Sequence, residues 1–343
     1  MTPCCLPYLT MTGWTDNATS KVNGGNSSTM AAPPLLDDFE MVIYETIIAT
    51  VLTISTAFSL VLNLILILVF LRYSCLRTKH DVIVINLAIT NFIISFGISF
   101  YSTYTLNPGD IYHVKLVCLS FFIFIFGGIL ASLFILLFLA LERYLCIVYP
   151  AIHRQIGIRH IYMCSFIAYV FGALYIAIPF HFKNKWERYH LCVADVYPLE
   201  FSITEQILGI LIILAIFVIN SAVFKTAMSH AARINSLLRN FQNIHSRERK
   251  RQKGKAFVTV FLLSGISALC WIPLLVVFGY ESDPTLTEKT RWLLTQLLYV
   301  PVSINSLITA FIIGYRNKHF RDAITSSLCR RQHDCNRRIT IYV

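Results

Sequence analysis

The sequence predicts an all-α membrane protein, a bundle of seven transmembrane helices. Three observations support this fold class. The 343 residues are 56% hydrophobic and 14% charged, a composition too apolar and too poor in charge for an ordinary soluble domain. Seven windows contain no Lys, Arg, Asp or Glu, and all but one easily cross about 30 Å of hydrocarbon as helices. The basic residues concentrate in alternate connections between these windows.

The charge-free windows define the expected helices in chain order. They comprise residues 46–71, 82–109, 116–141, 161–182, 206–224, 256–280 and 292–315. The fifth window is short, and the polar residues Ser202 and Thr204 before it can extend its helix. We therefore expect an extracellular N-terminal segment at 1–40, the helix bundle at 41–315 and a cytoplasmic segment at 316–343.

An odd number of spans places the two termini on opposite sides of the membrane. The connections after the first, third and fifth windows, with the tail after Tyr315, carry 22 of the 29 basic residues and 5 of the 18 acids. Because cytoplasmic connections are enriched in Lys and Arg, we predict an extracellular N-terminus and a cytoplasmic C-terminus. Orientation and anionic lipid of the bilayer then explain the net charge of +11, so no nucleic-acid partner is expected.

Several positions are candidates for covalent modification. Asn17 and Asn26 begin N-x-[ST] glycosylation sequons in the N-terminal segment. Cys118 and Cys192 both lie on the oxidising side, where we predict a disulfide between them; two separate thiols are the alternative. Cys329 precedes two arginines and is a candidate for palmitoylation, with a solvated thiol as the alternative. The ten cysteines show no paired metal-ligand spacing, and we expect no metal and no cofactor.

Two motifs stand out, one directly after the third apolar window and one inside the sixth. Glu142-Arg143-Tyr144 closes the third window, and an ionised pair at the end of an apolar helix is expensive to dehydrate, which indicates a function. In the sixth window, Pro273 removes a backbone hydrogen bond and predicts a kink, and Trp271 lies within one turn of it.

The order and spacing of the motifs resemble the rhodopsin-like (class A) G-protein-coupled receptors over residues 46–329. The matching features are Leu87-Ala88-Ile89-Thr90-Asn91, Cys118 and Arg143 placed 25 residues apart, Cys270-Trp271-Ile272-Pro273, and Asn305-Ser306 followed by Arg316-Asn317-Lys318-His319-Phe320-Arg321. The resemblance implies a short cytoplasmic amphipathic helix after the seventh span. It also implies a plasma-membrane receptor for an extracellular ligand, coupled to a heterotrimeric G protein, with arrestin as a further candidate partner.

The resemblance also implies roles for the motif residues. Glu142, Arg143 and Tyr144 form the coupling switch, in which Arg143 pairs with Glu142 at rest and meets the G protein when the sixth helix moves. Trp271 and Pro273 form the hinge of that movement. A polar core is expected at Asn63, Asn91, Asn305 and Ser306, and the amides of Asn63 and Asn91 are expected to bond each other across helices.

Four departures from the family pattern weaken the expected resting latch. Asn91 replaces the usual Asp, so regulation by sodium is expected to be weak or absent. The seventh-helix N-P-x-x-Y motif reads as residues 309–313 in the ungapped alignment, or 305–309 in an alternative one, and lacks its proline and tyrosine in both. Lys253 occupies the position of the acid that restrains the third-helix arginine. The fifth window lacks proline and the fourth lacks tryptophan. Because these departures weaken the latch, we expect appreciable ligand-independent signalling.

The resemblance places a ligand cavity among the outer halves of the third, fifth, sixth and seventh helices. The expected lining is apolar with a few hydrogen-bonding groups: Ile125, Phe126, Ile129, Trp271, Leu274, Leu275, Phe278, Gln296, Tyr299 and Ser303. Amine receptors carry Asp at the position of Ile125 and opsins carry Lys at that of Ser303, so a biogenic amine and retinal are not expected. A small, largely apolar ligand of odorant or lipid type is favoured, and an acidic outer rim keeps a basic peptide as the alternative.

Other functional classes find less support in the sequence. The windows contain no ionisable midplane residue of the kind that transporters use, and no internal repeat is evident. They contain no catalytic constellation, and we do not expect an enzyme. Because the seventh-helix motif is degenerate, a coupling-deficient scaffold or decoy with the same fold stays open as an alternative.

Overall fold

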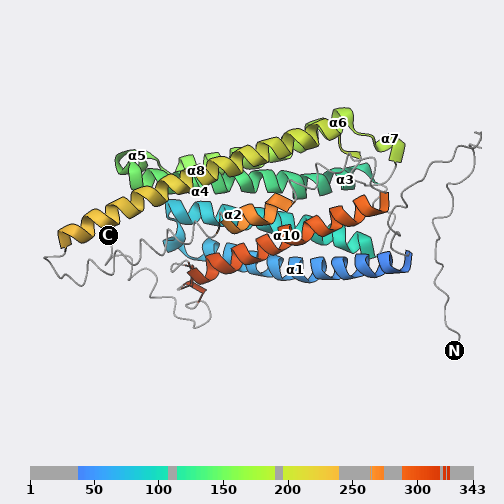
Figure 1. Ribbon diagram of the computed structural model, residues 1–343, viewed down its shortest axis with the longest axis horizontal. Helices are drawn as coiled ribbons and strands as arrows, with labels where there is room; N and C mark the ends of the chain where they lie inside the picture. The colour runs from blue at the N-terminus through green and yellow to red at the C-terminus, as the bar shows by residue number, and fades with distance from the viewer. Residues whose placement is uncertain are drawn as a thin grey trace, which may run out of the picture.

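The computed structural model describes residues 38–106, 114–189, 196–238, 263, 265–273, 288–316, 320–321 and 323–324, and its regular elements within them are helices (Figure 1). Six of these helices are long and apolar enough to cross a membrane: Ile43–Arg72, Lys79–Thr103, Lys115–Val148, Ile158–Lys183, Glu200–Thr226 and Leu297–Tyr315. They overlap six of the seven predicted windows. In the sixth window, residues 265–273 are helical. The all-α membrane fold is therefore confirmed.

The first two spans are joined by a short connection. α1 (Asp38–Arg72) is followed by the 3-10 helix η1 (Ser74–Leu76) and then by α2 (Lys79–Leu106). At the start of α2, the backbone N–H of Asp81 donates to the Thr78 hydroxyl at 3.2 Å, and that hydroxyl donates to the Asp81 carboxylate at 2.6 Å. The first N–H groups of every helix have no intrahelical partner. The bond to Thr78 satisfies one of these donors, and so fixes where α2 begins.

The third span changes helix type along its length. It consists of α3 (Lys115–Phe122), the π-helical η3 (Ile123–Gly127) and α4 (Gly128–Val148). π-Helical turns inside α-helices occur frequently at functional sites. The short helix α5 (Pro150–Gln155) then begins with proline in its first turn, where the missing N–H removes no intrahelical bond.

The second half of the chain supplies the remaining spans. These are α6 (Ile158–Lys183), the short α7 (Trp186–Tyr189), α8 (Leu199–Leu238), the helical residues 265–273, and α10 (Glu288–Arg316). α8 includes Ser202 and Thr204, so the predicted extension of the fifth span is confirmed. After α10 the described residues 320–321 and 323–324 are also helical, with Phe320 and Ala323 fully buried.

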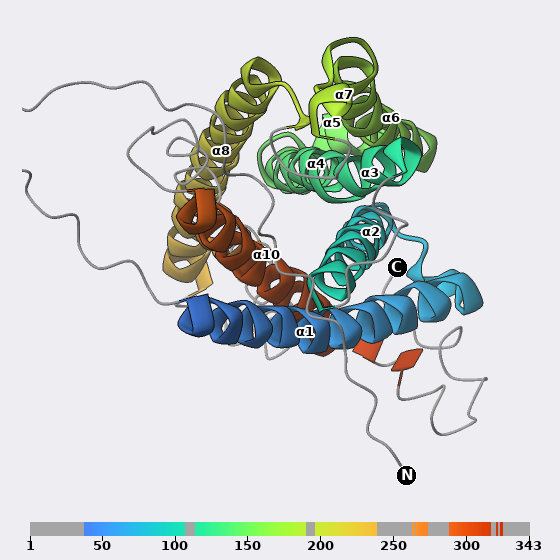
Figure 2. The same ribbon diagram turned by 90° about the vertical axis from the view of Figure 1, so that its right-hand side faces the viewer.

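The third span occupies the middle of the bundle. α4 contacts α2, α6 and α8, while α1 and α10 pack on each other and on α2 (Figure 2). The outer faces of the peripheral helices expose large apolar side chains such as Phe58, Phe166 and Phe217. Apolar bands of this extent are not tolerated on soluble monomers, so these faces are lipid-facing surfaces of a membrane protein.

The third span and α6 approach each other closely at two glycines, Gly127 of η3 and Gly172 of α6. A Cβ atom placed on Gly172 would lie 2.4 Å from the carbonyl oxygen of Gly127, and one placed on Gly127 would lie 3.0 Å from the carbonyl oxygen of Gly172. Real Cβ contacts are longer, so two bare backbones meet here. Small residues at helix interfaces allow such close packing within membranes.

Candidate functional site

Glu142 and Arg143 form an ion pair in the second half of α4. Arg143 Nε lies 3.4 Å from Glu142 Oε2, and the two side chains are only 17% and 9% exposed. Neither of these atoms makes a hydrogen bond within the part of the chain that the structure describes. The structure thus brings the predicted pair together as an electrostatic contact between two largely buried charges.

Two histidines that the sequence analysis did not single out surround the same carboxylate. His153 of α5 approaches Glu142 with a distance of 3.1 Å between Nε2 and Oε1, and His80 of α2 with 3.7 Å between Nδ1 and Oε2. Lys79 Nζ also donates to the backbone carbonyl of His153 at 2.7 Å. Glu142 therefore connects α2, α4 and α5 at one end of the bundle. No motif or spacing in the sequence pointed to either histidine.

Near the middle of the bundle, polar side chains join α1, α2 and α10. Asn63 Nδ2 donates to the Ser59 carbonyl at 2.8 Å and to the Ser306 carbonyl at 3.5 Å, and the hydroxyls of Ser59 and Ser95 lie 2.7 Å apart. Asn91 is fully buried, and neither atom of its amide finds a hydrogen-bond partner among the described residues. The expected bond between Asn63 and Asn91 is therefore not formed in the structure.

A second polar group joins α10 to its neighbours. The Ser267 hydroxyl donates to Asn305 Oδ1 at 3.0 Å, and the Ser55 hydroxyl donates to that of Ser303 at 2.9 Å. Asn305 and Ser303 are both buried. These bonds tie the helical residues 265–273 and α1 to opposite sides of α10, next to the predicted hinge at Trp271.

The predicted ligand-binding residues that the structure describes are mostly buried. Ile125, Ile129, Trp271, Tyr299 and Ser303 are each at most 5% exposed, and Phe126 is partly buried. Leu274, Leu275 and Phe278 lie outside the described residues, as does the side chain of Gln296.

Next to the predicted Phe126 and Tyr299 lie aromatic rings that the sequence analysis did not name: Tyr101, Phe122, Phe180 and Tyr197. The ring of Phe122 lies 5.6 Å from Tyr197, 5.9 Å from Phe180 and 5.6 Å from Phe126, and Tyr101 lies 5.0 Å from Tyr299. Rings at these separations attract each other beyond their apolar burial. Their one sequence signal was the spacing of four residues between Phe122 and Phe126, which places both on one helix face.

Cys118 is buried at the start of the third span and takes part in a disulfide bond. Its predicted partner Cys192 lies outside the described residues, so the pairing stays a prediction. The glycosylation sites Asn17 and Asn26, the palmitoylation site Cys329 and the restraint position Lys253 also lie outside them.

We expect Cys118→Ser to lower the free energy of unfolding by about 2–5 kcal/mol, the cost of losing a native disulfide in small secreted domains. If Cys192 is the partner, the double variant Cys118→Ser/Cys192→Ser should be no less stable than either single variant. Thermal unfolding of the purified receptors measures this. Cys164→Ser is the control, because Cys164 is an exposed thiol on α6. Additive losses in the double variant would contradict the pairing.

The comparisons with known proteins agree with this architecture. Residues 62–326 match the family described as "7 transmembrane receptor (rhodopsin family)". The chain is 25% identical over 279 residues to human trace amine-associated receptor 2, covering 76% of each chain. It is 24% identical over 275 residues to human C-C chemokine receptor type 1, covering 76% of this chain and 75% of that protein. It is 26% identical over 282 residues to rhodopsin of Petromyzon marinus, covering 78% of this chain and 76% of that protein.

The names of these relatives do not agree on one ligand, and all three proteins are receptors rather than enzymes. The family match includes the polar core, the Glu142–Arg143 pair and the hinge segment. The protein therefore belongs to the rhodopsin family of seven-transmembrane receptors and is a G-protein-coupled receptor.

Proposed function

We propose that this receptor binds a small, largely apolar extracellular ligand and passes the signal to a heterotrimeric G protein through Arg143. In this proposal the receptor lies in the plasma membrane with its N-terminus outside the cell. The end of the bundle that carries Glu142 and Arg143 then faces the cytoplasm. The charge distribution of the connections supports this orientation.

The Glu142–Arg143 pair is the single observation that carries the coupling proposal. Two charges that are 9% and 17% exposed lie 3.4 Å apart, and the facing atoms make no hydrogen bond to any residue that the structure describes. Dehydrating charges without full hydrogen bonding is costly, so a pair built this way stabilises the fold little. It is better suited to a contact that opens, which is the role the family resemblance gives it.

The burial of the predicted lining supports an apolar ligand. Ile125, Ile129 and Trp271 are each at most 5% exposed and offer hydrocarbon and aromatic surface. Trp271 Nε1 has no hydrogen-bond partner among the described residues, which leaves one polar group for a ligand to meet. A basic peptide finds less support, because Glu200, an acid in the first turn of α8, already faces Lys183 at 3.6 Å.

Nucleotide exchange on purified heterotrimeric G proteins tests the coupling. We expect wild-type receptor in lipid nanodiscs to accelerate exchange on at least one G protein of a panel, and Arg143→Ala to reduce that rate to the receptor-free level. The physical reason is that alanine removes the guanidinium group, the cation of the motif that can donate hydrogen bonds to a carbonyl or carboxylate of the G protein. Arg154→Ala is the matched control, since Arg154 is an exposed arginine of the neighbouring α5.

Two outcomes would contradict the proposal. If folded wild-type receptor accelerated exchange on no G protein of the panel, the scaffold or decoy alternative would replace it. If Arg143→Ala and Arg154→Ala were equally active, the coupling contact would lie elsewhere than at Arg143.

A further inference from the structure

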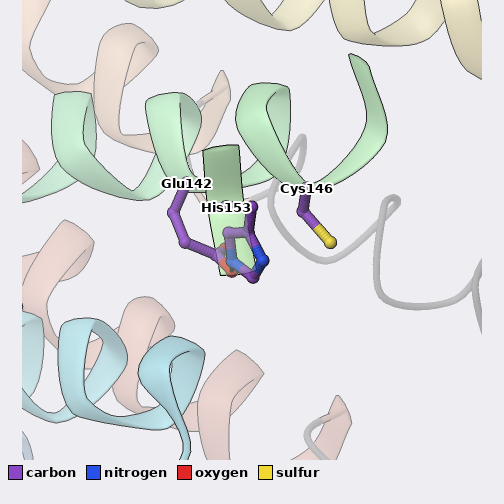
Figure 3. Close-up of side chains that lie close together, drawn as sticks. All are labelled: Glu142, Cys146 and His153. Atoms are coloured by element: carbon purple, nitrogen blue, oxygen red, sulfur yellow. Dashed lines mark hydrogen bonds and ion pairs between the residues drawn. The ribbon is translucent and has the colours of Figure 1, made fainter. Parts of the chain in front are cut away.

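Three side chains of two helices, α4 and α5, converge at the carboxylate of Glu142 (Figure 3). A carboxylate oxygen of Glu142, Sγ of Cys146 and a ring nitrogen of His153 all lie within 4.8 Å of one another, and Glu142 Oε1 lies 3.1 Å from His153 Nε2. With bonds of about 2.0–2.3 Å, two ligand atoms of a tetrahedral zinc ion lie about 3.3–3.7 Å apart. The cluster is therefore close to the dimensions of a metal site.

The fold holds both helices in fixed positions. Glu142 and Cys146 are four residues apart on α4, so their side chains share one face of that helix. The backbone N–H of His153 donates to the Tyr149 carbonyl at 3.1 Å, and its carbonyl accepts from Lys79 Nζ at 2.7 Å. His153 is thus held over the face that carries Glu142 and Cys146 before any ion arrives.

The donor atoms select the kind of metal. One imidazole nitrogen, one thiolate sulfur and one carboxylate oxygen suit Zn²⁺, whereas Mg²⁺ and Ca²⁺ prefer oxygen ligands alone. His80 is the nearest candidate for a fourth ligand, since its Nδ1 lies 3.7 Å from Glu142 Oε2 and makes no hydrogen bond to the described residues. Cys146 is exposed, which gives an ion a route into the cluster. In the cytosolic orientation proposed above, its thiol also stays reduced.

We propose that Glu142, Cys146 and His153 bind Zn²⁺, and that the bound ion competes with Arg143 for the Glu142 carboxylate. Binding forms bonds from zinc to the carboxylate oxygen, the neutral imidazole and the thiolate, and the thiol proton passes to solvent. A divalent ion on Glu142 cancels the charge that attracts Arg143 at 3.4 Å. Zinc should therefore loosen the ion pair and raise ligand-independent G-protein coupling, a consequence that rests on the proposed function whereas the binding itself does not.

Protection of Cys146 from a thiol-modifying maleimide tests the binding without any G protein. The full-length receptor in nanodiscs is modified in buffered Zn²⁺ or in Mg²⁺, and the rate at each cysteine is read by mass spectrometry. At free zinc ten times the dissociation constant, the unliganded fraction falls about elevenfold, and we expect modification of Cys146 to slow by about the same factor. Mg²⁺ should have no effect, and zinc should leave the rate at Cys164, the exposed thiol of α6, unchanged.

Single variants separate a built site from adventitious binding to a thiol. His153→Gln and Glu142→Gln should both abolish the protection of Cys146, while His160→Gln, an exposed histidine of α6, should keep it. Lack of protection in the wild type, or equal protection in His153→Gln, would overturn the site. Co²⁺ gives a second measurement, because a sulfur-to-cobalt charge-transfer band should appear in the wild type and not in Cys146→Ser.

Nucleotide exchange then tests the regulatory consequence. We expect zinc to increase ligand-independent exchange by the wild type and not by His153→Gln. Protection of Cys146 without this increase would overturn the competition with Arg143 and leave the metal site in place. Protection of Cys146 in a receptor that activates no G protein would support the zinc site and refute the proposed function. Nucleotide exchange without protection of Cys146 would support the proposed function and refute the zinc site.

Discussion

Gly172→Leu is expected to yield no folded receptor at the cell surface. A single Cβ atom at this position already meets the carbonyl oxygen of Gly127 at 2.4 Å and the backbone nitrogen of Ala131 at 3.4 Å. Backbone atoms cannot rotate away as a side chain can, so the third span and α6 must separate to admit the new side chain. Overpacking costs about 1–3 kcal/mol for a few added methylenes and more where backbone must shift, against a total stability of about 5–15 kcal/mol.

A pair of alanine variants isolates the cause of this loss. Gly172→Ala should lower the thermal unfolding midpoint of the purified receptor, while Gly314→Ala should leave it unchanged or raise it. A Cβ atom on Gly314 meets only Leu66 and Ile324 side chains at 3.8 and 3.9 Å, which is ordinary contact. Alanine in a helix gains about 0.5–1 kcal/mol over glycine. Equal midpoints for the two variants would show that the third span and α6 are not in backbone contact at Gly172.

The spans were predictable because the hydrocarbon excludes charge. The window 161–182 corresponds to a helix at Ile158–Lys183. The window 206–224 corresponds to a much longer helix, Leu199–Leu238, whose first turns carry Glu200 and Glu205. A charge-free window measures the thickness of the apolar layer, whereas backbone hydrogen bonds continue beyond it wherever no residue breaks them. Helix ends in this protein were therefore less predictable than helix positions.

Within the site, the contact between sequence neighbours was predictable, whereas the contacts between residues distant in the sequence were not. Glu142 and Arg143 are neighbours in the chain, and their pairing followed from the sequence. The approach of His153 depends on the turn that precedes α5, and that of His80 on how α2 packs against α4, so neither was visible in a motif. The bond expected between Asn63 and Asn91 is replaced by a local one, in which Asn63 donates to the Ser59 carbonyl one turn earlier at 2.8 Å. Short polar side chains often bond nearby backbone in this way.

The second large effect is expected at Glu142, where Glu142→Gln should raise ligand-independent nucleotide exchange. The substitution keeps the shape of the side chain and an oxygen that can accept from His153, but it removes the charge facing Arg143. If the pair exists only in the resting state, losing it shifts the equilibrium toward the active state by its interaction energy. For a largely buried pair without a hydrogen bond we expect about 1–2 kcal/mol, which is about a 5–30-fold increase in the active-to-resting ratio.

An exposed ion pair provides the matched control for this shift. Lys183 and Glu200 lie 3.6 Å apart at the other end of the bundle, with side chains 60% and 77% exposed. Solvent screens such pairs to about 0–1 kcal/mol, so Glu200→Gln should leave exchange at the wild-type rate. If Glu142→Gln also left it unchanged while Arg143→Ala abolished it, Arg143 would be the coupling contact but Glu142 would not restrain it. The resting state would then depend on other contacts of the receptor, and the zinc ion bound to Glu142 would have no restraint to release.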